Sequence, residues 1–135
     1  MRKIGIFLLA LALLLTLGAC SLIPGKQEAK IELYAIFNEA TGELSSPIEY
    51  SIVGGTTYAF LDYGKPFNQS SLGMSIYQTN EESRMSVYDE YVLIDPEISQ
   101  VVFAFEIAEA AEYEMVIYFE DPDVPIAKRV FQVQY

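Results

Sequence analysis

The sequence predicts an all-β fold, a small antiparallel β-sandwich of about seven or eight strands that follows a cleaved N-terminal signal peptide. From Ile31 onward, apolar and polar residues alternate with a period of two, as in strands that are buried on one face. Turn-forming residues interrupt this alternation at intervals of roughly 8–14 residues. After the signal peptide, no segment combines helical periodicity with the length that a stable helix needs.

Four strands are expected in the first half of this domain. The first covers residues 31–37, where the apolar side chains at odd-numbered positions share one face. The segment 38–47 is rich in turn residues and is expected to be a loop. Strands at 48–53 and 56–63 follow, with a pair of glycines between them, and a fourth is marked by alternating apolar residues at 72–76.

The second half repeats the same pattern. Strands are expected at 84–94 and 101–107, separated by a turn that contains Asp95-Pro96. Residues 107–112 have a helix-forming composition but are too short for a stable helix, so they are expected to form a one-turn crossover. Strands at 113–119 and 131–135 complete the domain.

Tyr113 follows this short crossover and precedes the inward-facing Met115 by two residues. This arrangement resembles the corner of immunoglobulin-like domains, where a tyrosine hydroxyl bonds to the backbone a few residues upstream. The resemblance is one of architecture, because the cysteines and tryptophan of true immunoglobulins are absent. Two alternatives stay open: Tyr113 as an ordinary core aromatic, and an up-and-down barrel of lipocalin-like character.

The N-terminus has the layout of an export signal. Arg2 and Lys3 precede a 14-residue apolar stretch, residues 4–17, which small residues follow. As a helix this stretch would be only about 21 Å long, shorter than the ~30 Å hydrocarbon core of a bilayer. Cleavage is therefore favoured over a permanent transmembrane helix.

The sequence Leu17-Gly18-Ala19-Cys20 resembles the lipobox of bacterial lipoproteins, and Cys20 is the only cysteine. The resemblance implies cleavage between Ala19 and Cys20 and attachment of lipid to Cys20. It divides the chain into a signal peptide (1–19), a lipidated tether (20–30) and a β-sandwich domain (31–135). The alternatives are a free cysteine beside an ordinary signal-peptidase site, and an uncleaved anchor.

The same resemblance implies a location in the cell envelope, on the extracytoplasmic side of a bacterial membrane. In a Gram-negative cell, Ser21 rather than aspartate after the lipidated cysteine implies the outer membrane. Several acyl chains hold a protein firmly, whereas one chain gives only reversible attachment.

Composition limits the function of the mature domain. It carries six basic and 19 acidic side chains, a net charge of −13, which argues against nucleic acid as a partner. The chain has no histidine, which excludes serine-type triads, cysteine–histidine dyads and the usual zinc sites. We expect no cofactor and a monomeric domain.

Two polar clusters are candidate sites. Tyr88, Asp89, Glu90 and Tyr91 form an aromatic and acidic sequence that suits contact with a protein or an envelope polymer. The ordinary interpretation of these tyrosines is that they lie in the core or on a sheet face, with their hydroxyls at the surface. Glu120, Asp121 and Asp123 could supply part of a calcium site, which Asp89, Glu90, Asp95 or Glu97 would complete if the fold brings them near. The ordinary interpretation of the second cluster is a solvated, charged loop.

Two further groups of charges have ordinary explanations. Glu106, Glu109, Glu112 and Glu114 could in principle include a general acid and base, but they are expected on a solvated face. Lys128-Arg129, which precedes the last strand, is expected to pair with acids on a neighbouring strand, such as Glu114 or Glu120.

The sequence therefore favours a membrane-anchored envelope lipoprotein that acts as a non-catalytic binding or assembly module. A lipocalin-like carrier of a small apolar ligand and a hydrolase that uses only carboxylates are the alternatives. A filled core would support the module, a deep aromatic cavity the carrier, and two converging carboxylates the enzyme.

Overall fold

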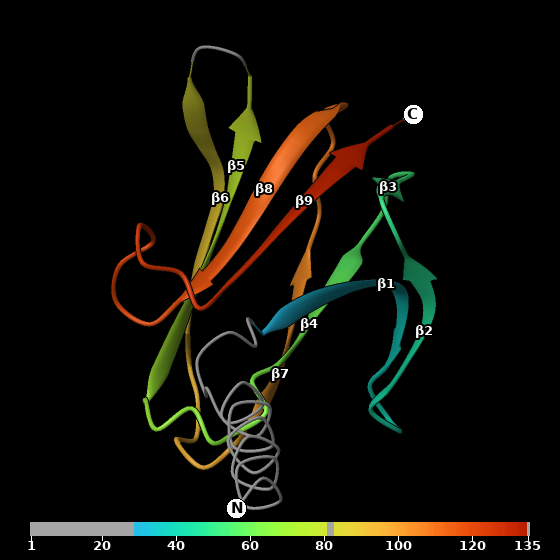
Figure 1. Cartoon of the computed structure of the whole chain (residues 1–135). Helices are drawn as coiled ribbons and strands as arrows, with labels where there is room; N and C mark the ends of the chain where they lie inside the picture. The colour runs from blue at the N-terminus through green and yellow to red at the C-terminus, as the bar shows by residue number, and fades with distance from the viewer. Residues whose placement is uncertain (1–28, 81–82, 135) are drawn as a thin grey trace, which may run out of the picture.

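The computed structural model describes residues 29–80 and 83–134, which form two packed β-sheets (Figure 1). Within these ranges no helix is long and apolar enough to cross a membrane. The nine strands of the described part are β1 (Lys30–Asn38), β2 (Glu43–Ile48), β3 (Ser51–Ile52), β4 (Thr57–Asp62), β5 (Ser71–Thr79), β6 (Arg84–Leu93), β7 (Gln100–Phe105), β8 (Ala111–Tyr118) and β9 (Ala127–Val133).

The strand order confirms the predicted sandwich. One sheet has the order β2-β1-β4-β7, and the other has the order β3-β9-β8-β5-β6. The pairings are antiparallel except between β3 and β9, which run parallel. Because the two sheets are separate, the alternative of an up-and-down barrel is wrong.

The strand count differs from the prediction because of β2. Residues 43–47 were expected in a loop and Ile48 at the start of the next strand, but residues 43–48 pair with β1 after a turn in which the Gly42 N–H donates to the Asn38 carbonyl at 2.7 Å. Gly42 has a φ of 72°, a conformation that glycine adopts readily. Pro47 is tolerated because β2 is an edge strand. The strand expected at 48–53 shortens to β3.

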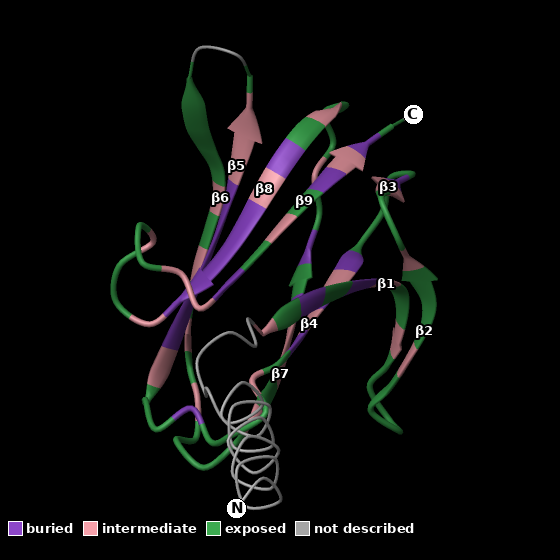
Figure 2. Ribbon diagram, viewed as in Figure 1, coloured by how far each residue is buried: buried purple, intermediate pink, exposed green. Residues whose placement is uncertain are grey.

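The core lies between the sheets and follows the predicted alternation (Figure 2). In β8, for example, Tyr113, Met115 and Ile117 are at most 1% exposed. The alternation fails in the second half of β1, where Ala35, which was expected to face the core, is exposed and Phe37 is only partly buried. There β1 continues to pair with β2 but no longer with β4, so this part of the hairpin leaves the sandwich.

The predicted tyrosine corner is present at the crossover between the two sheets. The Tyr113 hydroxyl donates to the Glu109 carbonyl at 2.7 Å, and the Tyr113 ring stacks on Phe131 with centroids 5.7 Å apart. The crossover contains no helical turn, and residues 111–112 already belong to β8. The segment is too short to gain from helix formation, and the tyrosine bond holds it instead.

Replacing Tyr113 by phenylalanine should reduce the free energy of unfolding by about 1 kcal/mol, because the half-buried Glu109 carbonyl loses its donor while the ring packing is kept. Urea denaturation followed by circular dichroism measures this change. Tyr34→Phe is the control, since Tyr34 donates to Glu32 on the surface, and it should have little effect. Equal stabilities of the two variants would contradict the role of the corner.

Candidate functional site

The predicted patch Tyr88–Tyr91 lies in β6, at the edge of the five-stranded sheet. The register places its residues on two faces. Tyr88 and Glu90 pair with Ile76 and Met74, whose side chains belong to the core. Asp89 and Tyr91 pair with Ser75 and Gly73 and therefore lie on the outer face.

On the inner side, Tyr88 helps to close the edge of the sandwich. Its hydroxyl lies 3.1 Å from a carboxylate oxygen of Glu90 and 3.4 Å from the Ala104 carbonyl of β7. Burial, together with the negative charge of Glu90, raises the pKa of Tyr88 above its ordinary value. The hydroxyl therefore keeps its proton and remains a donor between the two sheets.

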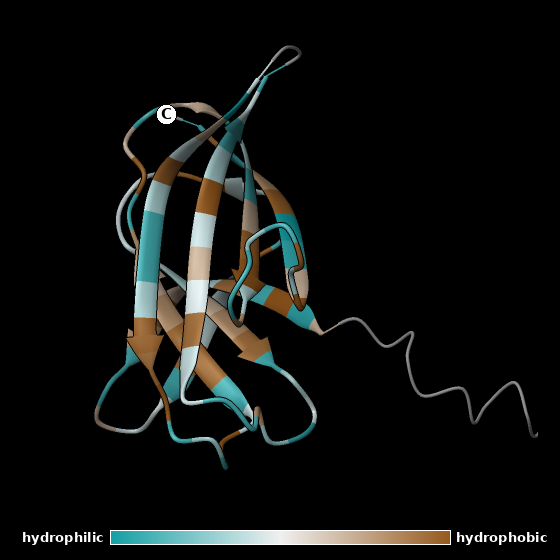
Figure 3. Ribbon diagram, turned by 90° about the vertical axis from the view of Figure 1, so that its left-hand side faces the viewer, coloured by the Kyte–Doolittle hydropathy of each residue, from teal (hydrophilic) through white to brown (hydrophobic). Residues whose placement is uncertain are grey.

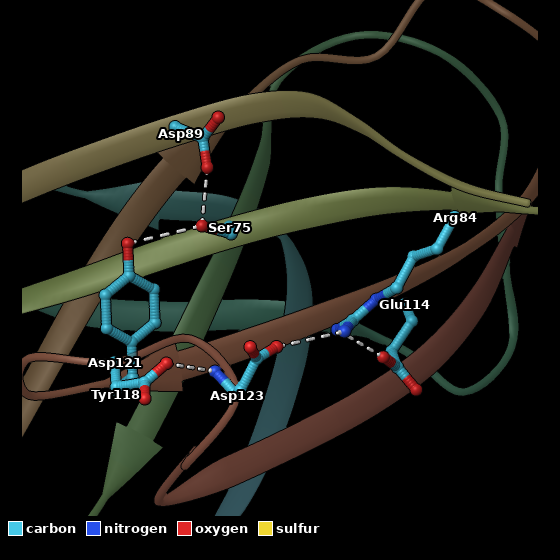
Figure 4. A network of polar contacts seen from close by, with 7 residues as sticks. All are labelled: Ser75, Arg84, Asp89, Glu114, Tyr118, Asp121 and Asp123. Carbon is cyan, nitrogen blue, oxygen red and sulfur yellow. Dashed lines mark hydrogen bonds and ion pairs between the residues drawn. The ribbon is translucent and has the colours of Figure 1, made fainter.

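On the outer face, Asp89 is the centre of a hydrogen-bond network (Figure 4). Its carboxylate accepts from the hydroxyls of Ser75 and Ser86, each at 2.5 Å. Both bonds lower the pKa of Asp89, and the bond from Ser75 has the larger effect. The Tyr118 hydroxyl lies 3.3 Å from the Ser75 oxygen, so the network joins β5, β6 and β8.

The Tyr118 ring lies directly over Gly73. A Cβ atom at position 73 would be 2.3 Å from the ring, so only glycine allows this approach. Ser75, beside this ring, is 1% exposed. A shielded serine and a carboxylate with a lowered pKa make a poor nucleophile and a weak base, so this network stabilises the packing of the outer face.

The acidic loop between β8 and β9 folds over the outer face of this sheet (Figure 3). Within it, Asp121 accepts from the Asp123 backbone N–H at 2.8 Å. The carboxylate of Asp123 lies 3.9 Å from Arg84, which also bonds Glu114 at 2.7 Å and covers the ring of Tyr77 (Figure 4).

In residues 29–80 and 83–134, no three histidine, cysteine, aspartate or glutamate side chains are gathered so that they could hold a metal ion. Among the described residues, the calcium candidates Glu120, Asp121 and Asp123 are therefore not joined by Asp89, Glu90, Asp95 or Glu97, the acids that could have completed a site. Asp89 bonds two serines, and Asp95 accepts from the backbone N–H of Glu97 at 2.9 Å.

Arg129 has a role that the sequence analysis missed. It faces inward between the sheets, beside the buried Phe131. Its guanidinium donates to the carbonyls of Ile31 at 2.8 Å, Ile48 at 3.0 Å and Glu49. The expected pairing of Arg129 with Glu114 or Glu120 is thus wrong, and Glu114 pairs with Arg84 instead. The alternation in β9 already placed a charge at an inward position, which was the available signal.

An open groove of about 1350 Å³ adjoins Arg129 at the side where the described chain begins. Ala29 and Lys30 form part of its wall, together with the ends of β4 and β9. Its charged lining residues are three cations and three acids: Lys30, Lys128, Arg129, Glu32, Glu49 and Asp62. The predicted lipid-attachment site Cys20 and cleavage residue Ala19 lie outside the described residues.

No protein-family description matches the chain. No curated protein matches it either. Among solved structures, the chain is similar to the PmoD soluble domain from Methylocystis sp. ATCC 49242 (Rockwell), with a TM-score of 0.55 and 12% identity over 82% of this chain and 94% of that one. It also aligns with a superoxide reductase (neelaredoxin) from Ignicoccus hospitalis, with a TM-score of 0.42 and 9% identity over 64% and 76% of the two chains. At such identity, the first likeness is one of fold.

Proposed function

We propose that the chain is a bacterial envelope lipoprotein whose β-sandwich acts as a non-catalytic binding or assembly module. Lipid on Cys20 holds it on the extracytoplasmic side of the membrane, and its partner is a protein or envelope polymer. The basic residues, the apolar stretch and the lipobox-like sequence at the N-terminus support the anchor. The structure of the β6 edge supports binding.

The exposed edge of β6 is the observation that carries the binding function. This ten-residue strand pairs with β5 on one side and forms the border of its sheet on the other. Several of its large apolar side chains are exposed, with Tyr91 at 56% and Leu93 at 88%. Such an edge can pair through its backbone with an extended segment of another protein. The net charge of −13 favours a basic partner.

The interior of the sandwich supports a module rather than a carrier. The space between the sheets is filled by large side chains that are less than 2% exposed, among them Tyr113, Phe131, Leu33 and Leu61. A lipocalin-like carrier would instead need a cavity at this position to enclose its ligand. The filled core therefore favours recognition on the outside of the domain.

The variant Cys20→Ser tests the anchor. We expect it to accumulate as an unprocessed precursor with complete loss of lipid labelling, because serine offers no thiol for the lipid. Metabolic labelling with a radioactive fatty acid and membrane fractionation measure both effects. Wild-type protein with the same signal peptide is the control, and undiminished labelling of Cys20→Ser would refute the anchor.

Site-specific crosslinking tests the binding edge. A photoreactive residue at Leu93, in β6, should give a discrete crosslinked species in intact envelopes. The same residue at Val53, which is 77% exposed and outside β6, serves as the control and should not form this species. Crosslinking that is equal at the two positions, or absent at Leu93, would contradict a role of β6 in binding.

A further inference from the structure

We propose that the groove beside the start of β1 faces the membrane and binds the headgroups of zwitterionic phospholipids. This inference rests on the proposed lipid anchor at Cys20. The folded domain itself then makes a second contact with the membrane. This contact determines the orientation in which the β6 edge is presented.

The path of the chain places this groove near the membrane. Ala29 and Lys30, the first described residues, form part of its wall. Ala29 is nine positions after Cys20, and nine residues span at most about 32 Å when fully extended. The groove wall is thus the part of the described domain with the shortest covalent path to the anchor.

The charges of the groove differ from those of the rest of the domain. Three of the five basic residues in the described part line it, and they are balanced by three acids. The other described residues carry 13 acids and two basic side chains, a net charge of −11. An anionic surface would repel those regions. The groove is the neutral region that can approach a lipid surface.

Side chains of both signs are available there for a ligand. Lys30 and Lys128 are exposed and form no ion pair with another described residue, so they can contact a phosphate. Glu49 carries a negative charge and can contact an ammonium group. Arg129 is held by three backbone carbonyls and stabilises the groove floor. A headgroup with one phosphate and one ammonium group matches this set, whereas an anionic headgroup matches only the lysines.

The test uses the mature chain, residues 20–135, coupled through its single cysteine to a maleimide lipid in nanodiscs. The discs contain phosphatidylethanolamine, phosphatidylcholine and a trace of lipid with a nitroxide on the headgroup. Paramagnetic relaxation of backbone amides then reports distance from the headgroups. We expect strong relaxation at Lys30, Gly64 and Val130, which line the groove. We expect weak relaxation at Asn80 and Ser83, in the β5–β6 hairpin that projects at the top of Figure 1.

The double variant Lys30→Gln/Lys128→Gln should lower the ratio of docked to undocked domain by roughly tenfold, because the charged hydrogen bonds from the two lysines to the headgroup phosphate are lost. Val53→Glu/Val124→Glu is the control, since it changes the net charge equally at exposed positions outside both the groove and β6. The control should keep the wild-type relaxation pattern. Uniform relaxation in the wild type, or an unchanged pattern in the double variant, would overturn the proposal.

A second set of discs tests the headgroup class. Replacing part of the zwitterionic lipid by phosphatidylglycerol should weaken the pattern, because the whole domain is acidic. A stronger pattern on these discs would overturn the zwitterionic assignment. Because the lipid is attached chemically, this result does not depend on processing in cells. Failure of the anchor itself would appear separately, as normal lipid labelling of Cys20→Ser.

Discussion

Replacing Met115 by aspartate should leave the domain largely unfolded at 25 °C. Met115 is fully buried in β8, which lies between β5 and β9 in the five-stranded sheet. Its cross-strand neighbour on β9 is Arg129. A carboxylate at position 115 would stay unpaired or would draw Arg129 away from its three carbonyls, and both outcomes leave buried polar groups without partners. The cost, about 5 kcal/mol, is comparable with the whole stability of a small domain.

Circular dichroism and urea denaturation measure this loss, and Glu114→Lys is the control at the adjacent position. Glu114 lies on the outer face, where its side chain is 24% exposed and bonds Arg84. Loss of this pair on the surface should cost at most about 1 kcal/mol. A folded Met115→Asp variant with near-normal stability would contradict the observed placement of β8 residues.

Replacing Arg129 by methionine should reduce the free energy of unfolding by about 3 kcal/mol. Methionine keeps the apolar stem, but the carbonyls of Ile31, Ile48 and Glu49 lose a shared donor. Hydrogen bonds to a charged group contribute roughly 1.5–3 kcal/mol each, and bonds to one guanidinium do not add independently. Because two of these carbonyls follow β2 or end it, hydrogen exchange should also accelerate in β2.

The matched control is Lys128→Met, one residue earlier in β9. Lys128 is exposed and forms no ion pair with another described residue, so its replacement should change stability by less than about 0.5 kcal/mol. Equal losses in the two variants would show that charge, and not the contact between the sheets, determines the effect of Arg129.

The sequence alone was sufficient to predict the sandwich, most strand positions and the tyrosine corner. These features depend on local patterns, because a period of two determines which side chains share a face of a strand. Thus Leu72, Ile76 and Met115 are buried as their alternation indicates. Tyr113 likewise bonds a carbonyl only four residues upstream. The proposed export signal and the proposed lipid site at Cys20 also rest on local sequence patterns.

Only the tertiary structure showed the features that depend on distant residues. β2 has a turn-rich sequence and is a strand because β1 supplies its hydrogen bonds. Arg129 contacts carbonyls 80 to 98 positions away. Ser75 joins Asp89 to Tyr118, and Tyr118 is 43 positions after Ser75. Composition and periodicity describe neighbours along the chain. These contacts arise instead because the packing of the two sheets brings remote polar groups together, and each polar group that is buried there needs a hydrogen-bond partner.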